Sequence, residues 1–111
     1  MNFGLLDTDI KRIREVFDLY PEVQRVVLYG SRAKGSYKPA SDIDLTLIGT
    51  ELNLTIQQKI ERQLDDLMLP YKFDISLYTH ISNHDLLEHI ARVGKPFFTK
   101  DKIDESKIGV V

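Results

Sequence analysis

Hydrophobic residues recur along the chain with two different periods. A spacing of three and four residues is typical of a helix with one buried face, whereas alternation is typical of a half-buried strand. The helical spacing predicts helices over residues 8–20, 54–68 and 82–93, with Thr55 and Ser82 near the starts of the last two as capping residues. Runs rich in β-branched or alternating residues predict strands over 23–29, 42–48 and 71–78, and the segment KPFFTKD predicts a short edge strand.

A glycine- and serine-rich stretch, residues 30–40, separates the first two predicted strands, and we expect at most one helical turn in it. The order helix, strand, strand, helix, strand, helix indicates an α+β sandwich, with helices over one face of a small mixed sheet. We expect a single domain over residues 1–111, with the polar segment 102–111 as a frayed tail.

Composition excludes several classes of protein but does not indicate a reaction or a ligand. The chain of 111 residues is 42% hydrophobic and 29% charged, which is ordinary for a soluble globular domain. A formal net charge of -2 gives no bulk basic character, so we expect no strong nucleic-acid binding. No apolar run is long enough to cross a membrane. The chain has no cysteine, which excludes thiolate chemistry and fits a cytoplasmic protein.

Three aspartates fall on the polar faces of the second and third predicted strands. Asp42 and Asp44 are two residues apart, so their side chains point the same way from Cα atoms about 6–7 Å apart. Asp74 has the same polar phase in the next strand. Such carboxylates repel one another unless a cation lies between them, and Mg²⁺ prefers carboxylate oxygens together with substrate phosphates. An isolated Asp-x-Asp is more often a pair of solvated surface residues than a metal site. The residues around it must therefore decide between the two.

The turn GSRAKGS, which directly follows the first strand, has features of a phosphate-binding loop. Glycine lets the backbone approach a ligand closely, and amides at the start of a helical turn can bind phosphate oxygens. The turn is not a Walker A loop, because Ser36 stands where that motif requires lysine. A basic surface turn closing a hairpin is the simpler alternative for this stretch taken alone. Positive charge nearby comes from Arg32, Lys34 and Lys38.

Taken together, the segments LYGSRAKG, SDIDL and KFDISLY resemble the signature of the polymerase-β-type nucleotidyltransferase superfamily. The residues of these motifs are most similar to those of the minimal nucleotidyltransferases of the MntA-like antitoxin class, and the resemblance covers residues 26–78. It implies a compact mixed sheet with flanking helices, the nucleotidyltransferase fold. It also implies a nucleoside triphosphate substrate, ATP or another, with a two-metal magnesium site.

The resemblance assigns roles to individual residues. Gly30 and Ser31 are expected to hold the triphosphate, and the positive charge of Arg32 makes it the third expected nucleotide-binding residue. The catalytic and metal-binding residues are expected to be Asp42, Asp44 and Asp74. Among them, Asp74 is expected to bind the catalytic metal and to assist the acceptor hydroxyl.

The reaction that follows is attack of an acceptor hydroxyl on the α-phosphorus of the triphosphate, with pyrophosphate leaving. The family resemblance implies transfer of AMP from ATP to a tyrosine of a helical HEPN-type toxin held in a hetero-oligomer, so that the chain acts as an antitoxin. One alternative is an adaptor without catalysis, or with weak catalysis, that binds nucleotide and neutralises the HEPN protein by complex formation. A remoter alternative is a small-molecule nucleotidyltransferase of the antibiotic-modifying kind.

Two further features leave their meaning open. The histidines at 80, 84 and 89 lack the spacing of a zinc pair, so we expect surface or capping residues. Apolar residues of the third predicted helix and of the segment PFF fit either the core or a partner interface.

Overall fold

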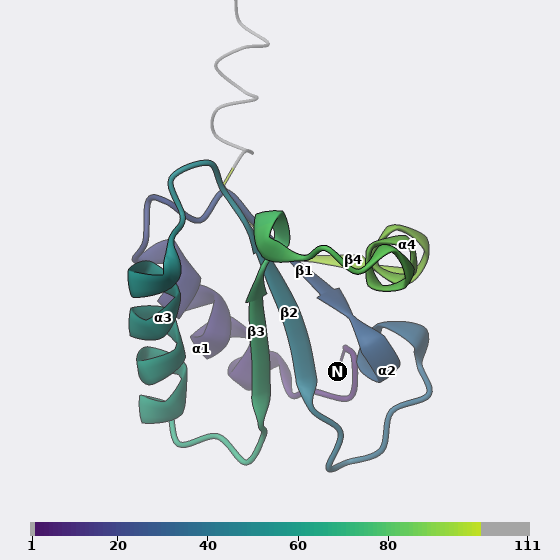
Figure 1. Ribbon diagram of the computed structural model, residues 1–111. Coiled ribbons are helices and arrows are strands. Elements are labelled where there is room, and N and C mark those ends of the chain that lie inside the picture. The colour runs from purple at the N-terminus through teal and green to yellow at the C-terminus, as the bar shows by residue number, and fades with distance from the viewer. Residues whose placement is uncertain (1, 101–111) are drawn as a thin grey trace, which may run out of the picture.

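The computed structural model describes residues 2–100, so the predicted frayed tail at 102–111 lies outside the described residues. Within them no helix is long and apolar enough to cross a membrane. The elements follow the predicted order, with a short helix added after the first strand and a 3₁₀ turn after the third (Figure 1). Their bounds are α1 Asp7–Asp18, β1 Arg25–Tyr29, α2 Gly30–Lys34, β2 Ile43–Ile48, α3 Leu54–Asp66, β3 Phe73–Leu77, η1 Tyr78–His80, α4 His84–Val93 and β4 Lys95–Thr99.

The described strands form one mixed sheet in the order β3-β2-β1-β4 (Figure 1). The central strand β1 pairs antiparallel with both β2 and β4, whereas β2 and β3 pair in parallel. A parallel pair needs a crossover connection, and α3 provides it between β2 and β3. This arrangement confirms the predicted α+β class and brings the strand that carries Asp44 beside the strand that carries Asp74.

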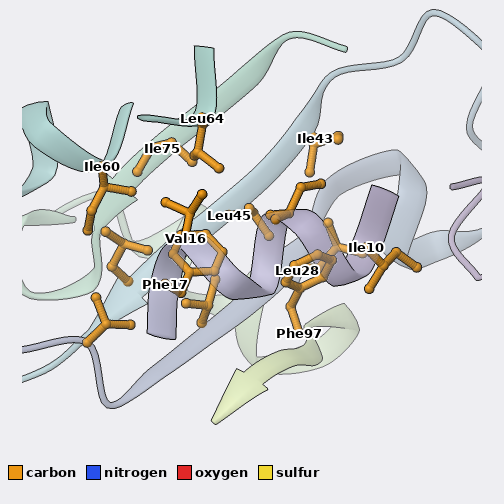
Figure 2. Close-up of a cluster of buried hydrophobic side chains, with 14 of the residues drawn as sticks. Ile10, Val16, Phe17, Leu28, Ile43, Leu45, Ile60, Leu64, Ile75 and Phe97 are labelled. Atoms are coloured by element: carbon orange, nitrogen blue, oxygen red, sulfur yellow. The ribbon is translucent and has the colours of Figure 1, made fainter. Parts of the chain in front are cut away.

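The hydrophobic core lies between the sheet and the helices α1 and α3 (Figure 2). Phe17 of α1 and Ile60 of α3 are fully buried there against strand residues such as Leu45. Burying each such side chain contributes about 1.5–3 kcal/mol of transfer free energy. In the segment PFF, Phe97 is 1% exposed and its ring meets that of Phe17 edge to face at 6.3 Å. Phe97 is therefore a core residue and not part of an exposed interface.

The prediction that the helices cover one face of the sheet is wrong for α4. Side chains alternate along β1, so Val27 and Tyr29 lie on the face opposite Leu28 and the core. The α4 helix packs on that opposite face: the ring of His89 contacts Tyr29, and a Cβ at Gly94 would meet a methyl group of Val27. The continuous apolar run of β1 allows this, because it buries residues on both faces.

The helix α3 begins at Leu54 as predicted, but the capping residues of α3 and α4 differ from the predicted Thr55 and Ser82. Asn53 caps α3, with its side chain accepting a hydrogen bond from the Ile56 N–H, and Asn83 caps α4 in the same way through the Leu86 N–H. Both caps lie within two residues of the expected ones. Asn serves as well as Ser or Thr here, because the side chains of all three accept a hydrogen bond from the first free N–H groups of a helix.

Candidate active site

Tyr29, Asp44 and Asp74 form a row across three neighbouring strands. In the sheet register Asp44 pairs directly with Asp74 on one side and with Tyr29 on the other. Directly paired residues share a face, and adjacent strands lie about 4.8 Å apart. The two carboxylates predicted to act together therefore start from neighbouring backbone positions, on the face opposite the core. We call these three residues the acid row.

Asp42 lies at the entrance to the acid row. The β2 strand begins at Ile43, one residue later than predicted, so Asp42 belongs to the preceding loop and is exposed. It is near enough to Asp44 for its charge to raise the pKa of that carboxyl group. The predicted aspartates thus converge on Asp44.

The surroundings of Asp44 and Tyr29 are unfavourable to the ionisation of these two side chains. Burial raises the pKa of Asp44 to about 6, and the negative charges of Asp74 and Asp42 act in the same direction. The positive charge of Arg32 opposes them without cancelling them. Burial also raises the pKa of Tyr29, and the charges of Asp74 and Asp44 add to the shift. Such a concentration of uncompensated negative charge is typical of a functional site that receives a cation.

Gly30 brings the predicted phosphate turn into contact with Asp44. It follows β1 directly and opens α2 with a φ of 75°, in the left-handed region that favours glycine. A Cβ on Gly30 would collide with the Oδ2 atom of Asp44. Ser31 comes next, and its carbonyl accepts hydrogen bonds from the N–H groups of Gly35 and Ser36, which closes the turn. The expected binding of triphosphate by Gly30 and Ser31 remains a prediction.

Arg32 has a different set of contacts from the one that its expected role would need. Its side chain is 1% exposed, and its guanidinium donates hydrogen bonds to the carbonyl groups of Phe3, Pro39 and Ser41. The guanidinium also lies over the ring of Tyr71, 5.3 Å from its centroid. Arg32 therefore anchors the loop that leads to Asp42. Its contact with nucleotide remains a prediction.

His89 was expected to be a surface or capping residue; it is not an exposed surface residue, and it binds the first N–H group of α2, as a capping residue does. The side chain is half-buried, and its Nε2 atom accepts a hydrogen bond of 3.1 Å from the Gly30 N–H. The ring also meets that of Tyr29 edge to face, with centroids 6.2 Å apart. Its place in the sequence, next to Ile90 and three residues after Leu86, was the available signal, because it puts His89 on the apolar side of the helix.

The acid row offers the type of ligand that Mg²⁺ prefers, but its side chains do not surround an ion. Carboxylate oxygens are the ligands that Mg²⁺ prefers, and a cation would relieve the repulsion that raises the pKa of Asp44. Yet within residues 2–100 no three acidic or histidine side chains are gathered closely enough to enclose a metal ion. The residues present fit an ion shared with a substrate phosphate, which is how Mg²⁺ commonly binds.

Comparisons with known proteins agree with this fold. The family model described as "Polymerase beta, Nucleotidyltransferase" matches residues 11–103. No curated protein matches the sequence.

Several solved structures share the fold. A toxin–antitoxin crystal structure with AMP-PNP is 22% identical, with a TM-score of 0.66 over 91% of this chain and 79% of that chain. A tri-AMPylated Shewanella oneidensis HEPN toxin in complex with MNT antitoxin is 19% identical, with a TM-score of 0.62 over 88% and 76%. The toxin–antitoxin MntA-HepT is 19% identical, with a TM-score of 0.63 over 90% and 78%.

Proposed function

The chain belongs to the polymerase beta nucleotidyltransferase family, and we propose that it transfers AMP from ATP to a hydroxyl group of a partner protein. The observation that carries this proposal is the direct register of Asp44 with Asp74 beside the glycine turn at Gly30. The carboxylates could bind the cations and the glycine turn could bind the phosphates, so one face of the sheet would hold the triphosphate together with its cations.

In the proposed reaction an acceptor hydroxyl oxygen forms a bond to the α-phosphorus of ATP while the bond to pyrophosphate breaks. Asp42, Asp44 and Asp74 would hold Mg²⁺, which supplies positive charge to the triphosphate and favours ionisation of the acceptor when bound. Asp74 is exposed on β3, an edge strand of the described sheet, so it is open to an approaching hydroxyl and can take up its proton. Ser31 and its turn would orient the leaving pyrophosphate, and positioning would supply much of the rate.

The acceptor in this proposal is a tyrosine of a helical HEPN-type protein, and the chain is its antitoxin. Support comes from the solved structures of the same fold, which include a tri-AMPylated HEPN toxin in complex with MNT antitoxin. Another of them contains AMP-PNP, an ATP analogue. This chain would form a hetero-oligomer with its own partner, at a site reached from the exposed side of Asp74.

A second candidate function is that of an adaptor that neutralises the HEPN protein by binding it, with little or no catalysis. One observation favours it: solved structures of the same fold include the toxin–antitoxin MntA-HepT, and complex formation is all that such an adaptor needs. The two candidates make opposite predictions for variants that lose one carboxylate and keep the fold.

The deciding experiment measures transfer of label from α-labelled ATP to a co-expressed HEPN partner. The variants are Asp44→Asn and Asp74→Asn, with Asp65→Asn, an exposed carboxylate on α3, as the matched control. Catalysis predicts that the first two lose transfer by about a hundredfold or more while the control keeps it. Full transfer by both variants would exclude the proposed mechanism. Neutralisation of the partner that survives both substitutions would favour the adaptor.

A further inference from the structure

We propose that His89 is a positioning residue of this site: by accepting the Gly30 N–H, it fixes the turn against which the Asp44 carboxylate rests. The catalytic part of this inference depends on the proposed function, whereas its structural part does not. The residues that meet here lie on β1, α2, β2 and α4, so the contact is a product of the tertiary fold.

His89 contacts both residues that flank the peptide between Tyr29 and Gly30. Its Nε2 atom accepts from the Gly30 N–H at 3.1 Å, and its ring packs edge to face on Tyr29 at an interplanar angle of 82°. A histidine accepts at Nε2 only as the neutral imidazole with its proton on Nδ1. The lone pair of Nε2 is therefore engaged by the backbone and is not offered to a substrate.

The orientation of this peptide matters because of what surrounds Gly30. The residue has a φ of 75° and its α-carbon faces the Oδ2 atom of Asp44 with no room for a methyl group. A rotation of the peptide would move the α-carbon, and the carboxylate would lose the surface that it rests on. The first N–H groups of a helix have no partner within that helix. His89 supplies that partner for Gly30 at the start of α2.

Other roles for His89 fit the observations less well. A zinc ligand needs further ligands, and no three histidine or acidic side chains within residues 2–100 are gathered for one. A surface role conflicts with its half-burial and its two contacts with Tyr29 and Gly30. The helix that carries His89 is itself fixed, because Ile90 is 6% exposed and Gly94 packs closely on Val27. A fixed helix is what a positioning residue requires.

Two substitutions separate the acceptor atom from the ring. His89→Gln keeps an acceptor oxygen near the place of Nε2 and removes the ring, whereas His89→Phe keeps the ring and removes the acceptor. His89→Met, without ring or comparable acceptor, serves in place of the phenylalanine variant if that variant does not fold. His84→Phe, an exposed histidine on the same helix, is the control.

The readouts are hydrogen exchange of the Gly30 amide, the carboxyl ¹³C resonance of Asp44 at one pH, and kcat and KM for ATP. For His89→Phe we expect Gly30 exchange to rise and kcat to fall, each about tenfold, with a shifted Asp44 resonance and little change in KM. His89→Gln should restore most of each value, and His84→Phe should change none.

Unchanged Gly30 exchange and Asp44 resonance in His89→Phe would overturn the inference. So would equal losses in the glutamine and phenylalanine variants, because the acceptor that glutamine keeps would then have restored nothing. A wild-type protein without transfer activity would count against the proposed function alone, since exchange and the Asp44 resonance still test the role of His89.

Discussion

The Oδ2 atom of Asp44 occupies the space that a Cβ at residue 30 would need, so the glycine of the turn and the carboxylate of the strand fit only as this pair. A position requires glycine when its φ is positive or when the backbone must approach another group closely. Gly30 meets both conditions. The contact explains how a turn and a strand residue that lie apart in the sequence form a single site.

Gly30→Ala should therefore destabilise the fold by about 2–4 kcal/mol, about 1 of which comes from the positive φ and the rest from displacing Asp44. Gly35→Ala is the matched control, because Gly35 has a φ of 86° and a Cβ added there would have no neighbour within 4 Å. It should cost only the backbone part, about 1 kcal/mol. Urea unfolding of both variants measures the difference. Equal losses would show that the contact with Asp44 is unimportant.

Asp44→Asn should stabilise the metal-free protein at neutral pH. Burial and neighbouring charges raise the pKa of Asp44 from 3.8 to about 6. A raised carboxyl pKa favours the folded state fully below pH 4, and that contribution is lost as pH rises through 6. After allowance for solvent screening of a half-exposed group, the gain is about 1–2 kcal/mol above pH 6 and near zero below pH 4. Thermal unfolding between pH 3.5 and 7.5 measures it; a gain independent of pH would contradict the prediction.

Arg32→Leu should be among the most destabilising single substitutions near the site. It would leave the part-buried carbonyl groups of Phe3, Pro39 and Ser41 without their donor, and an acceptor left unsatisfied costs up to about 1–3 kcal/mol. We expect a total loss of at least about 3 kcal/mol in urea unfolding. Lys34→Met, an exposed neighbour, should change stability by less than about 0.5 kcal/mol.

Arg32→Lys distinguishes an anchor from a nucleotide ligand. Lysine keeps the charge but cannot direct a planar fork at several carbonyl groups, so we expect most of the stability to be lost. A lysine variant that is as stable as wild type but binds ATP more weakly would instead support the predicted contact with nucleotide.

Magnesium should raise the melting temperature of the wild-type protein in the presence of an ATP analogue, and should raise it less when the pair of Asp44 and Asp74 is broken. A ligand at about a hundred times its Kd stabilises the folded state by about 2.7 kcal/mol. Asp74→Asn should lose most of that increment, and Asp65→Asn should keep it. An increment that is the same in all three proteins would place the cation elsewhere.

Much of this fold follows from local patterns, because periodicity reports which side of each element is buried. The side on which α4 packs could not be predicted from its own sequence, since an amphipathic helix fits either face of a sheet. The better indication lay in β1, where Val26, Val27 and Leu28 run without a polar residue, as in strands covered on both faces.

The residues of the candidate site could be predicted from the sequence, whereas most of their contacts could not. Asp44 and Asp74 share a polar phase, but their direct register depends on a parallel pairing that α3 must bridge. The contact between Gly30 and His89 spans 59 residues, and no local signal encodes it. A basic residue in a loop gives no indication whether its charge meets a ligand or, as with Arg32, backbone carbonyls.

The bond from Arg32 to the carbonyl group of Phe3 has a practical consequence for handling the protein. The turn at residues 2–5 is closed by hydrogen bonds between Asn2 and Leu5, and Gly4 packs tightly on the ring of Tyr37. Trimming these first residues, or fusing an affinity tag that pulls on them, would loosen the guanidinium that secures the approach to Asp42. A preparation altered there would report on a candidate site whose approach loop is incompletely assembled.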